Sequence, residues 1–140
     1  MDWLQATIDY GVIGLLLLMS VIAVAIAIER QLFYNGIRLA DYGDHQTLKL
    51  ELTDKLHIIA TIGSNAPYIG LLGTVLGIML TFYGIGQEGF MDTGKIMVGL
   101  ALALKATALG LVVAIPAIIL YNFLLRRVKV LLVQWESQYG

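Results

Sequence analysis

Three threonines and one lysine lie deep inside long apolar stretches of the chain: Thr74, Thr81, Thr107 and Lys105. A threonine hydroxyl donates one hydrogen bond and accepts others, but it cannot hold a charge. Inside an apolar helix it commonly bonds a carbonyl of its own or a neighbouring helix, which implies no further function. The alternative is that the hydroxyls line a narrow wetted pathway for protons. The residue types alone leave both interpretations open.

Lys105 is the ionisable residue that lies deepest within these stretches, and such residues are functional suspects by default. Lys105 and Thr107 are two residues apart, so on a helix they point about 160° away from each other. If Thr107 faces a pathway, Lys105 faces the first apolar stretch or lipid. The twenty residues 106–125 that follow form ~30 Å of helix, which places Lys105 near a membrane boundary. Its long stem could reach water there, and we interpret Lys105 as a membrane anchor.

The same stretches contain no carboxylate. No Asp or Glu occurs within residues 10–28, 56–87 or 95–125. A proton route across ~30 Å of hydrocarbon needs titratable groups or water along its length. The chain therefore either conducts no protons or uses a carboxylate that a partner helix supplies.

Other chemistry has little support in the sequence. The chain has no cysteine and two histidines, which removes thiol catalysis and makes a histidine metal cluster improbable. Asp41, Asp44 and His45 lie in a polar segment without a second histidine nearby, so we expect no metal site. No nucleophile–base pair or phosphate-binding loop is recognisable, and we expect no enzyme activity and no cofactor. A net charge of −1 offers no basic field for nucleic acid.

The composition is that of a membrane protein. Hydrophobic residues make up 59% of the chain and the mean hydropathy is +0.82, against about 45–50% apolar residues in soluble domains. We predict an all-α membrane protein that forms one membrane domain over residues 1–140. The expected spans are about 10–28, 65–86 and 98–122, with a cytoplasmic segment 29–62 and a tail 123–140.

Basic residues predict the orientation. The segment 29–62 and the tail together contain seven lysines and arginines, whereas the connection between the second and third spans contains Lys95 alone. Because basic residues concentrate on the cytoplasmic side, the N-terminus is expected outside and the C-terminus inside. The first apolar run ends at the charged pair Glu29–Arg30, which we interpret as an interfacial stop. The run is therefore expected to be a retained span and not a signal peptide.

Small residues recur at helical spacing in the second and third spans. Gly63, Gly70, Gly77 and Gly84 are seven residues apart, and on a helix the first three share the face of Thr74. Small residues let membrane helices approach closely. We expect a ring-forming homo-oligomer whose subunits meet through these glycines. The helix-packing residues expected in the two spans are Gly63, Gly70, Gly77, Ala103, Gly110 and Ala114.

Two further local expectations concern the inner helices. Pro67 and Pro116 are expected to kink the second and third spans without ending them. The leucine and isoleucine spacing between residues 48 and 59 favours a helix that continues into the second span as one long helix. The glycines of residues 84–94 indicate the connection to the third span. On the third span, the face around Thr107 is expected to pack inward, including Leu111 and Ile118.

Two separated motifs resemble the ExbB/TolQ family. They are APYIGLLGTVLGIM at 66–79 and ALKATALGLVVAIPAIILYN at 103–122. The resemblance implies a pentamer in the inner membrane of a Gram-negative bacterium, with the second and third spans around a central pore. It also implies an ExbD-like partner, which brings a proton-binding aspartate on a single span, and a TonB-like transducer. Thr74 and Thr107 match the pore threonines of the family.

The resemblance implies a subunit of a motor that uses the proton motive force to energise TonB-dependent outer-membrane uptake. A TolQ-like role in envelope integrity, a self-contained channel or small transporter, and a passive scaffold remain alternatives. The chain departs from the family pattern at three positions. Leu102 replaces a frequent glutamate, Lys105 an apolar residue and Leu76 a tryptophan. The glutamate's absence argues against a mechanism in which this subunit itself carries the proton.

Overall fold

The computed structural model describes residues 2–140, which form helices joined by short connections. Three helices are long and apolar enough to cross a membrane, which confirms the predicted all-α membrane fold. The longest has 47 residues and therefore extends ~70 Å, more than twice the ~30 Å hydrocarbon core, so it must protrude. The elements are α1 (Asp2–Asn35), the 3₁₀ helix η1 (Leu39–Asp41), α2 (His45–Leu52), α3 (Leu56–Glu88) and α4 (Thr93–Tyr139).

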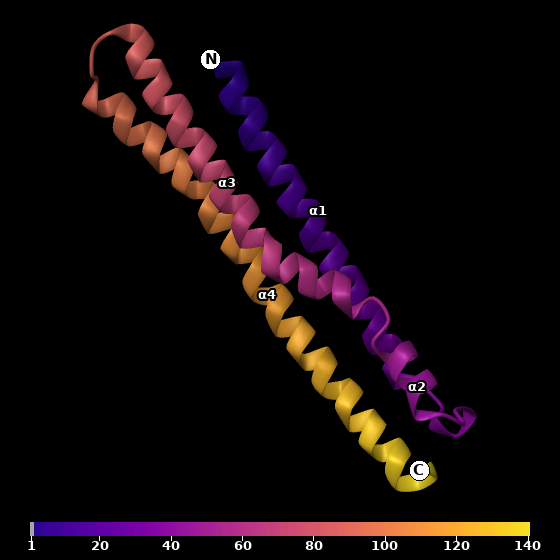
Figure 1. Ribbon diagram of the computed structural model, residues 1–140. Helices are drawn as coiled ribbons and strands as arrows, with labels where there is room; N and C mark the ends of the chain where they lie inside the picture. Colours follow the sequence, from indigo (N-terminus) through magenta and orange to yellow (C-terminus); the bar gives the residue numbers. More distant parts are fainter. Residues whose placement is uncertain (1) are drawn as a thin grey trace.

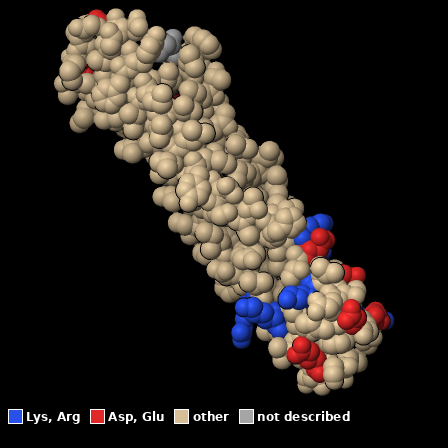
Figure 2. Space-filling view, in the orientation of Figure 1, with Lys and Arg blue, Asp and Glu red and all other residues tan. Residues whose placement is uncertain are grey.

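The helices form an elongated bundle (Figure 1). The N-terminus lies at the end that carries the α3–α4 connection, and α2 lies at the opposite end with the C-terminus. Figure 2 shows charged side chains gathered at the α2 end, while the long middle of this face is uncharged. This distribution suits an apolar span with one protruding polar end. Its orientation in a membrane remains a prediction.

Both prolines lie inside helices that continue past them, Pro67 in α3 and Pro116 in α4. α3 changes direction partway along its length: its first turns run beside α1, and the remainder runs along α4 (Figure 1). The closest and most extensive packing in the molecule is that between α3 and α4. The packing of α3 against α4 therefore determines the positions of the polar side chains in the apolar region.

The expectation of one continuous helix from residue 48 into the second span is wrong. α2 ends at Leu52, a turn follows, and α3 begins at Leu56. Lys55 in this turn has φ 68°, a left-handed conformation that is uncommon outside glycine. Its ammonium lies 4.0 Å from the Glu29 carboxylate on α1, which helps to hold the turn. The local apolar spacing gave no sign of the break.

The connection between α3 and α4 is also shorter than expected. α3 continues to Glu88, so Gly84 and Gly86 are helical, and the turn is made by residues 89–92. Gly89 ends α3 with φ 77°, a conformation that glycine adopts without steric cost. Asp92 then begins α4, because its carboxylate accepts from the amides of Gly94 and Lys95.

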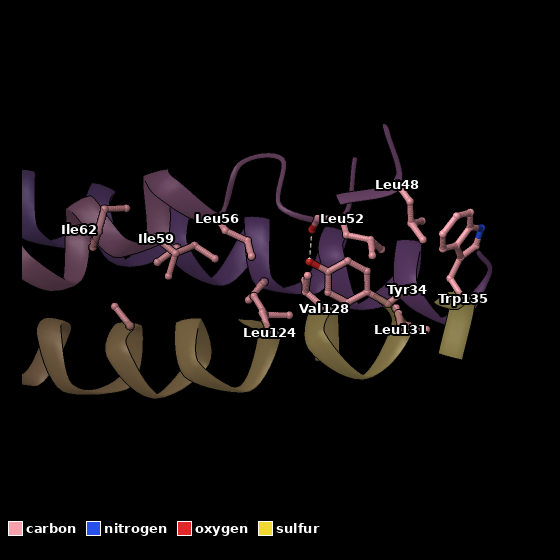
Figure 3. Close-up of a cluster of buried hydrophobic side chains, with 13 residues drawn as sticks. Tyr34, Leu48, Leu52, Leu56, Ile59, Ile62, Leu124, Val128, Leu131 and Trp135 are labelled. Carbon is pink, nitrogen blue, oxygen red and sulfur yellow. Dashed lines mark hydrogen bonds between the residues drawn. The ribbon is translucent and has the colours of Figure 1, made fainter. Parts of the chain in front are cut away.

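The largest apolar core lies toward the polar end of the molecule. In Figure 3, side chains of α2 and of the first turns of α3 point toward α4 and Tyr34. Trp135 near the end of α4 is 7% exposed, and its indole N–H donates to the Tyr42 carbonyl at 3.0 Å. Burial, and the hydrogen bond that the Tyr42 hydroxyl donates to Glu51, raise the pKa of Tyr42 to about 12. The phenol therefore remains a donor at physiological pH.

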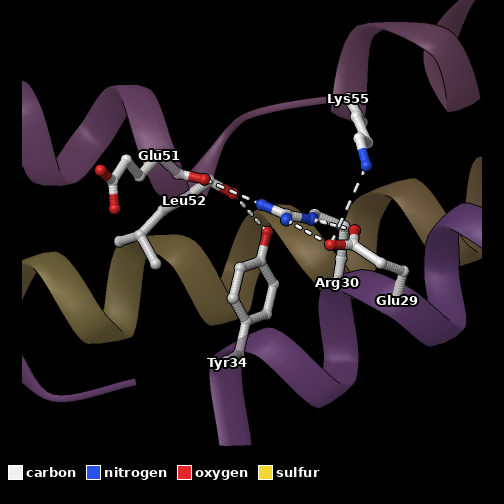
Figure 4. Close-up of polar contacts among 6 residues, drawn as sticks. All are labelled: Glu29, Arg30, Tyr34, Glu51, Leu52 and Lys55. Carbon is white, nitrogen blue, oxygen red and sulfur yellow. Dashed lines mark hydrogen bonds and ion pairs between the residues drawn. The ribbon is translucent and has the colours of Figure 1, made fainter. Parts of the chain in front are cut away.

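Arg30 and Tyr34 of α1 donate hydrogen bonds to the last two carbonyls of α2 (Figure 4). The Arg30 guanidinium donates to the Glu51 carbonyl at 2.8 Å, and the Tyr34 hydroxyl donates to the Leu52 carbonyl at 2.5 Å. Arg30 is 4% exposed and forms two 2.6 Å hydrogen bonds with the Glu29 carboxylate, so its charge is balanced. The charged pair therefore does more than end a membrane span: it connects α1 to α2.

Removal of the Tyr34 hydroxyl tests this arrangement. Tyr34→Phe keeps the ring but leaves the buried Leu52 carbonyl without its donor, which costs about 1–3 kcal/mol of unfolding free energy. Thermal unfolding of the purified protein in detergent measures the loss. Tyr139→Phe, at a side chain that is 50% exposed, is the matched control and should change little. Equal transition temperatures for Tyr34→Phe and the unchanged protein would contradict the capping role.

Candidate functional site

α3 and α4 cross with their backbones in contact, because glycines face each other at the crossing. Gly70 of α3 and Gly110 of α4 are both buried. A Cβ added to Gly70 would lie 2.5 Å from the Ala106 carbonyl oxygen, and one added to Gly110 would lie 2.6 Å from the Ala66 carbonyl oxygen. Neither backbone oxygen can move without moving its helix. The crossing therefore excludes any residue larger than glycine at both positions.

The face of α4 that packs inward consists of glycine and alanine alone. It differs from the face expected around Thr107, because Leu111 and Ile118 are exposed and the buried face is rotated toward Ala106. Small side chains fill the close part of the α3–α4 contact, and Ile118 contacts α3 only where Gly63 leaves room for it. The buried residues of α4 in the apolar region are Gly99, Ala103, Ala106, Gly110, Ala114 and Ala117.

The glycine contacts lie within one chain. A Cβ on Gly63 would meet Ile118, and one on Gly77 would lie 3.0 Å from the Ala103 Cβ, both on the same chain's α4. These glycines were expected at contacts between subunits, and within the subunit they pack α3 against α4. Two further packing glycines were not predicted. Gly99 leaves room for the Thr81 side chain, and Gly73 leaves room for Val12 of α1.

Thr74 and Thr107 meet across the α3–α4 contact. Thr74 is 7% exposed, and its hydroxyl is 2.8 Å from the Ala103 carbonyl of α4 and 3.3 Å from the Gly70 carbonyl of its own helix. The two threonine hydroxyls are also hydrogen-bonded to each other. Thr107 is half-buried. Of the three threonines, Thr74 and Thr107 therefore form one site, and a single hydrogen bond joins their hydroxyls.

The direction of this hydrogen bond follows from the carbonyls. A hydroxyl has one hydrogen, and the carbonyls beside Thr74 can only accept, so Thr74 donates to them and Thr107 donates to Thr74. The hydrogen of Thr107 thus points inward. Its remaining lone pairs are free to accept a hydrogen bond from a group that approaches its exposed side. The site offers an acceptor, held in place by the helix contact.

Thr81 is separate from this pair. Its hydroxyl donates to the Gly77 carbonyl of its own helix at 2.9 Å, and the side chain is half-buried. It lines a cavity of about 660 Å³ near the α3–α4 connection, together with Glu88, Asp92 and Lys95. Glu88 and Lys95 form an ion pair of 3.0 Å at this cavity. This end of α3 and α4 is therefore open and polar, whereas Thr74 is buried and only Thr107 of the pair is partly exposed.

Lys105 is on the opposite side of α4 from α3. It is exposed and lines a small cavity of about 20 Å³ with Asp9 and Ile13 of α1. The expectation that Lys105 faces the first span or lipid agrees with this position. Its role as a membrane anchor stays a prediction, and Asp9 is a neighbour that the sequence analysis did not connect with it.

These features define a multi-pass helical membrane protein whose polar groups lie at helix contacts. The chain belongs to the MotA/TolQ/ExbB proton channel family, whose pattern matches residues 25–137. The family resemblance inferred from the two motifs is thereby confirmed. The matched region contains α3, α4 and the polar end, and so contains both threonines and the glycine crossing.

Two of three named relatives match nearly the whole chain, and the third matches about half of it. A protein of Aquifex aeolicus named biopolymer transport protein ExbB is 56% identical over 140 residues, which cover 100% of this chain and 95% of that protein. A Helicobacter pylori protein named putative biopolymer transport protein ExbB-like 2 is 55% identical over 133 residues, 95% of this chain and 89% of that protein. Biopolymer transport protein ExbB of Pseudomonas putida is 51% identical over 71 residues, which are 51% of this chain and 22% of that protein.

The crossing predicts different outcomes for glycines of the same sequence repeat. Gly70→Ala and Gly110→Ala should each lower the unfolding free energy by about 1–3 kcal/mol, because the new methyl group meets backbone. Gly84→Ala is the matched control: nothing lies within 4 Å of its Cβ, so it should stabilise α3 slightly through helix propensity. Thermal unfolding in detergent compares the three variants. A Gly70→Ala protein as stable as Gly84→Ala would refute the close crossing.

Proposed function

We propose that this protein is a pore-forming subunit of an inner-membrane motor driven by the proton motive force. With an ExbD-like partner it energises TonB-dependent uptake across the outer membrane. Membership of a proton channel family and the names of the full-length relatives support this proposal. The observation that carries the mechanism is the Thr74–Thr107 pair at the α3–α4 contact, in helices without a carboxylate over residues 57–87 and 96–125.

The Thr74–Thr107 pair provides a hydrogen-bonding surface beside a proton-binding group, and it does not bind the transferred proton itself. With its hydrogen directed to Thr74, Thr107 accepts a hydrogen bond from a protonated carboxyl but offers no hydrogen to a carboxylate. A hydrogen bond to the neutral form of an acid raises the pKa of that acid, and so does transfer of the acid from water into apolar surroundings. An aspartate on a partner's single span would therefore be held neutral beside Thr107 and would ionise when it moves to a hydrated region.

The faces of α3 and α4 that remain exposed in the subunit indicate how subunits would assemble. The glycine faces of α3 and α4 are used within the chain, so contacts between subunits fall to their exposed apolar faces. Large exposed side chains on these faces include Tyr68, Leu72 and Met79 of α3 and Leu104 and Val112 of α4. We infer a ring of five such α3–α4 units around a central pore, with the N-terminus outside and the C-terminus inside.

Native mass spectrometry of the detergent-solubilised protein tests the assembly, and the expected mass is that of five chains. Because the inferred contacts use the exposed faces, Tyr68→Ala and Met79→Ala should weaken the ring while the subunit still unfolds cooperatively. Gly84→Ala serves again as the control. A stable monomer in several mild detergents that retain lipid would contradict the ring.

The threonine variants test the mechanism. Thr74→Val and Thr107→Val keep the side-chain shape and remove the hydroxyl, and each should lower proton-driven uptake at least about tenfold, or about 1.4 kcal/mol. Thr107→Ser should retain a good part of the activity because the hydroxyl remains. Thr61→Val is the control, since the Thr61 hydroxyl bonds only the His57 carbonyl of its own helix. Normal uptake by Thr107→Val, with assembly intact, would exclude the proposed role of the pair.

Proton flux in liposomes tests whether the carboxylate comes from a partner. The protein alone should pass few protons, and co-reconstitution with a single-span partner that carries an intramembrane aspartate should raise the flux. Substitution of that aspartate by asparagine should abolish the increase. Proton-selective flux through this subunit alone, sensitive to Thr74→Val, would instead indicate a self-contained channel.

A further inference from the structure

Two residues of opposite charge line one small cavity at the contact between α1 and α4. Asp9 of α1 and Lys105 of α4 line the same small cavity, although 96 positions separate them in the sequence. Lys105 is exposed and Asp9 is half-buried. The other side chains around the cavity carry no charge, and all are aliphatic. They are Ile13, Leu102, Ala106 and Leu109.

The cavity lies at about the level of the threonine pair. Val12, one turn of α1 from Asp9, lies against Gly73, the neighbour of Thr74. Lys105 precedes Thr107 by two residues and points about 160° away from it. At this level α4 thus presents a hydroxyl toward α3 and an ammonium toward α1.

A charge among aliphatic side chains is costly unless an opposite charge or water compensates it. Within residues 2–140, the ion pairs of 4.0 Å or less do not include Asp9 with Lys105. The cavity that both residues line has a volume of about 20 Å³, and one water molecule needs roughly 10–15 Å³ and two to four polar partners. The carboxylate and the ammonium, directed into the cavity, would supply two partners of opposite sign. Both the size and the lining of the cavity therefore suit a single bridging water.

We propose that Asp9 and Lys105 form a water-bridged ion pair that connects α1 to α4. The pair makes Lys105 a positioning residue: it fixes the rotation of α4 about its axis and thereby keeps Thr107 directed at Thr74. Its effect on transport rests on the proposed function, but the pair itself does not. A lysine that serves only as a lipid anchor would have no dependence on Asp9.

A double-mutant cycle on the full-length protein in lipid nanodiscs tests the pair. Asp9→Asn and Lys105→Gln should each lower the thermal transition by about 3–6 °C. The double variant Asp9→Asn/Lys105→Gln should lose no more than the worse single variant, because the interaction can be removed only once. The exchanged pair Asp9→Lys/Lys105→Asp should recover at least about half of the loss. Lys129→Gln, at an exposed position on the protruding part of α4, is the matched control and should change nothing.

Additive losses in the cycle would overturn the proposal. An unchanged thermal transition for Asp9→Asn, together with a lowered transition for Lys105→Gln, would overturn the proposal as well. That result would favour Lys105 as a membrane anchor. Infrared difference spectra provide a measurement that does not depend on stability. The carboxylate band that Asp9→Asn removes should shift in Lys105→Gln and stay unchanged in Lys129→Gln; an unshifted band would refute the pair.

Neither experiment needs a partner protein or a proton gradient. If the cycle shows coupling while Thr107→Val transports normally, the ion pair stands and the proposed function fails. If the cycle shows no coupling while Thr107→Val is inactive, the proposed function stands and the ion pair fails.

Discussion

The contact between the backbones of Gly70 and Gly110 is the constraint on which the apolar region depends. Between lipid-facing helices the hydrophobic effect supplies little attraction, because lipid is as apolar as leucine. Association then relies on close packing and hydrogen bonds, and both need helix axes that approach closely. The absence of two side chains at the crossing brings the Ala103 carbonyl within 2.8 Å of the Thr74 hydroxyl. The polar site is thus a consequence of the packing.

The polar end of the molecule is stabilised in a different way. There the core is a conventional one of leucine, isoleucine and aromatic side chains, and burial away from water supplies the free energy. Arg30 and Tyr34 add specificity by pairing with the last carbonyls of α2. One chain therefore combines two kinds of helix contact, glycine against glycine in the apolar region and large side chains around Trp135 outside it. α4 takes part in both.

Much of the fold could be predicted from the sequence because hydropathy and small-residue spacing are local signals. They indicated three long helices, and two motifs indicated the family. The rotation of α4 was missed, because hydropathy does not distinguish Leu111, which is exposed, from a core leucine; only side-chain volume distinguishes them. The turn at Lys55 and the proximity of Asp9 to Lys105 were missed because both depend on contacts between distant parts of the chain. Thr74 and Thr107 were named, but the direction of their hydrogen bond required the Ala103 carbonyl.

The uninterrupted length of α4 has a mechanical consequence. From Thr107 to Trp135 the helix rises by 28 residue steps, or ~42 Å, and it continues past Pro116, where one backbone hydrogen bond is missing. The hydrogen-bonded turns on either side of Pro116 couple the two ends. A rotation or shift of α4 at the threonines is therefore transmitted along the rod to Trp135, where the indole is bonded to the Tyr42 carbonyl. The indole is also an intrinsic fluorophore that is sensitive to its surroundings. With the other tryptophan of the chain, Trp3, replaced, the fluorescence of Trp135 would therefore report movement at the polar end of α4, far from the threonine pair.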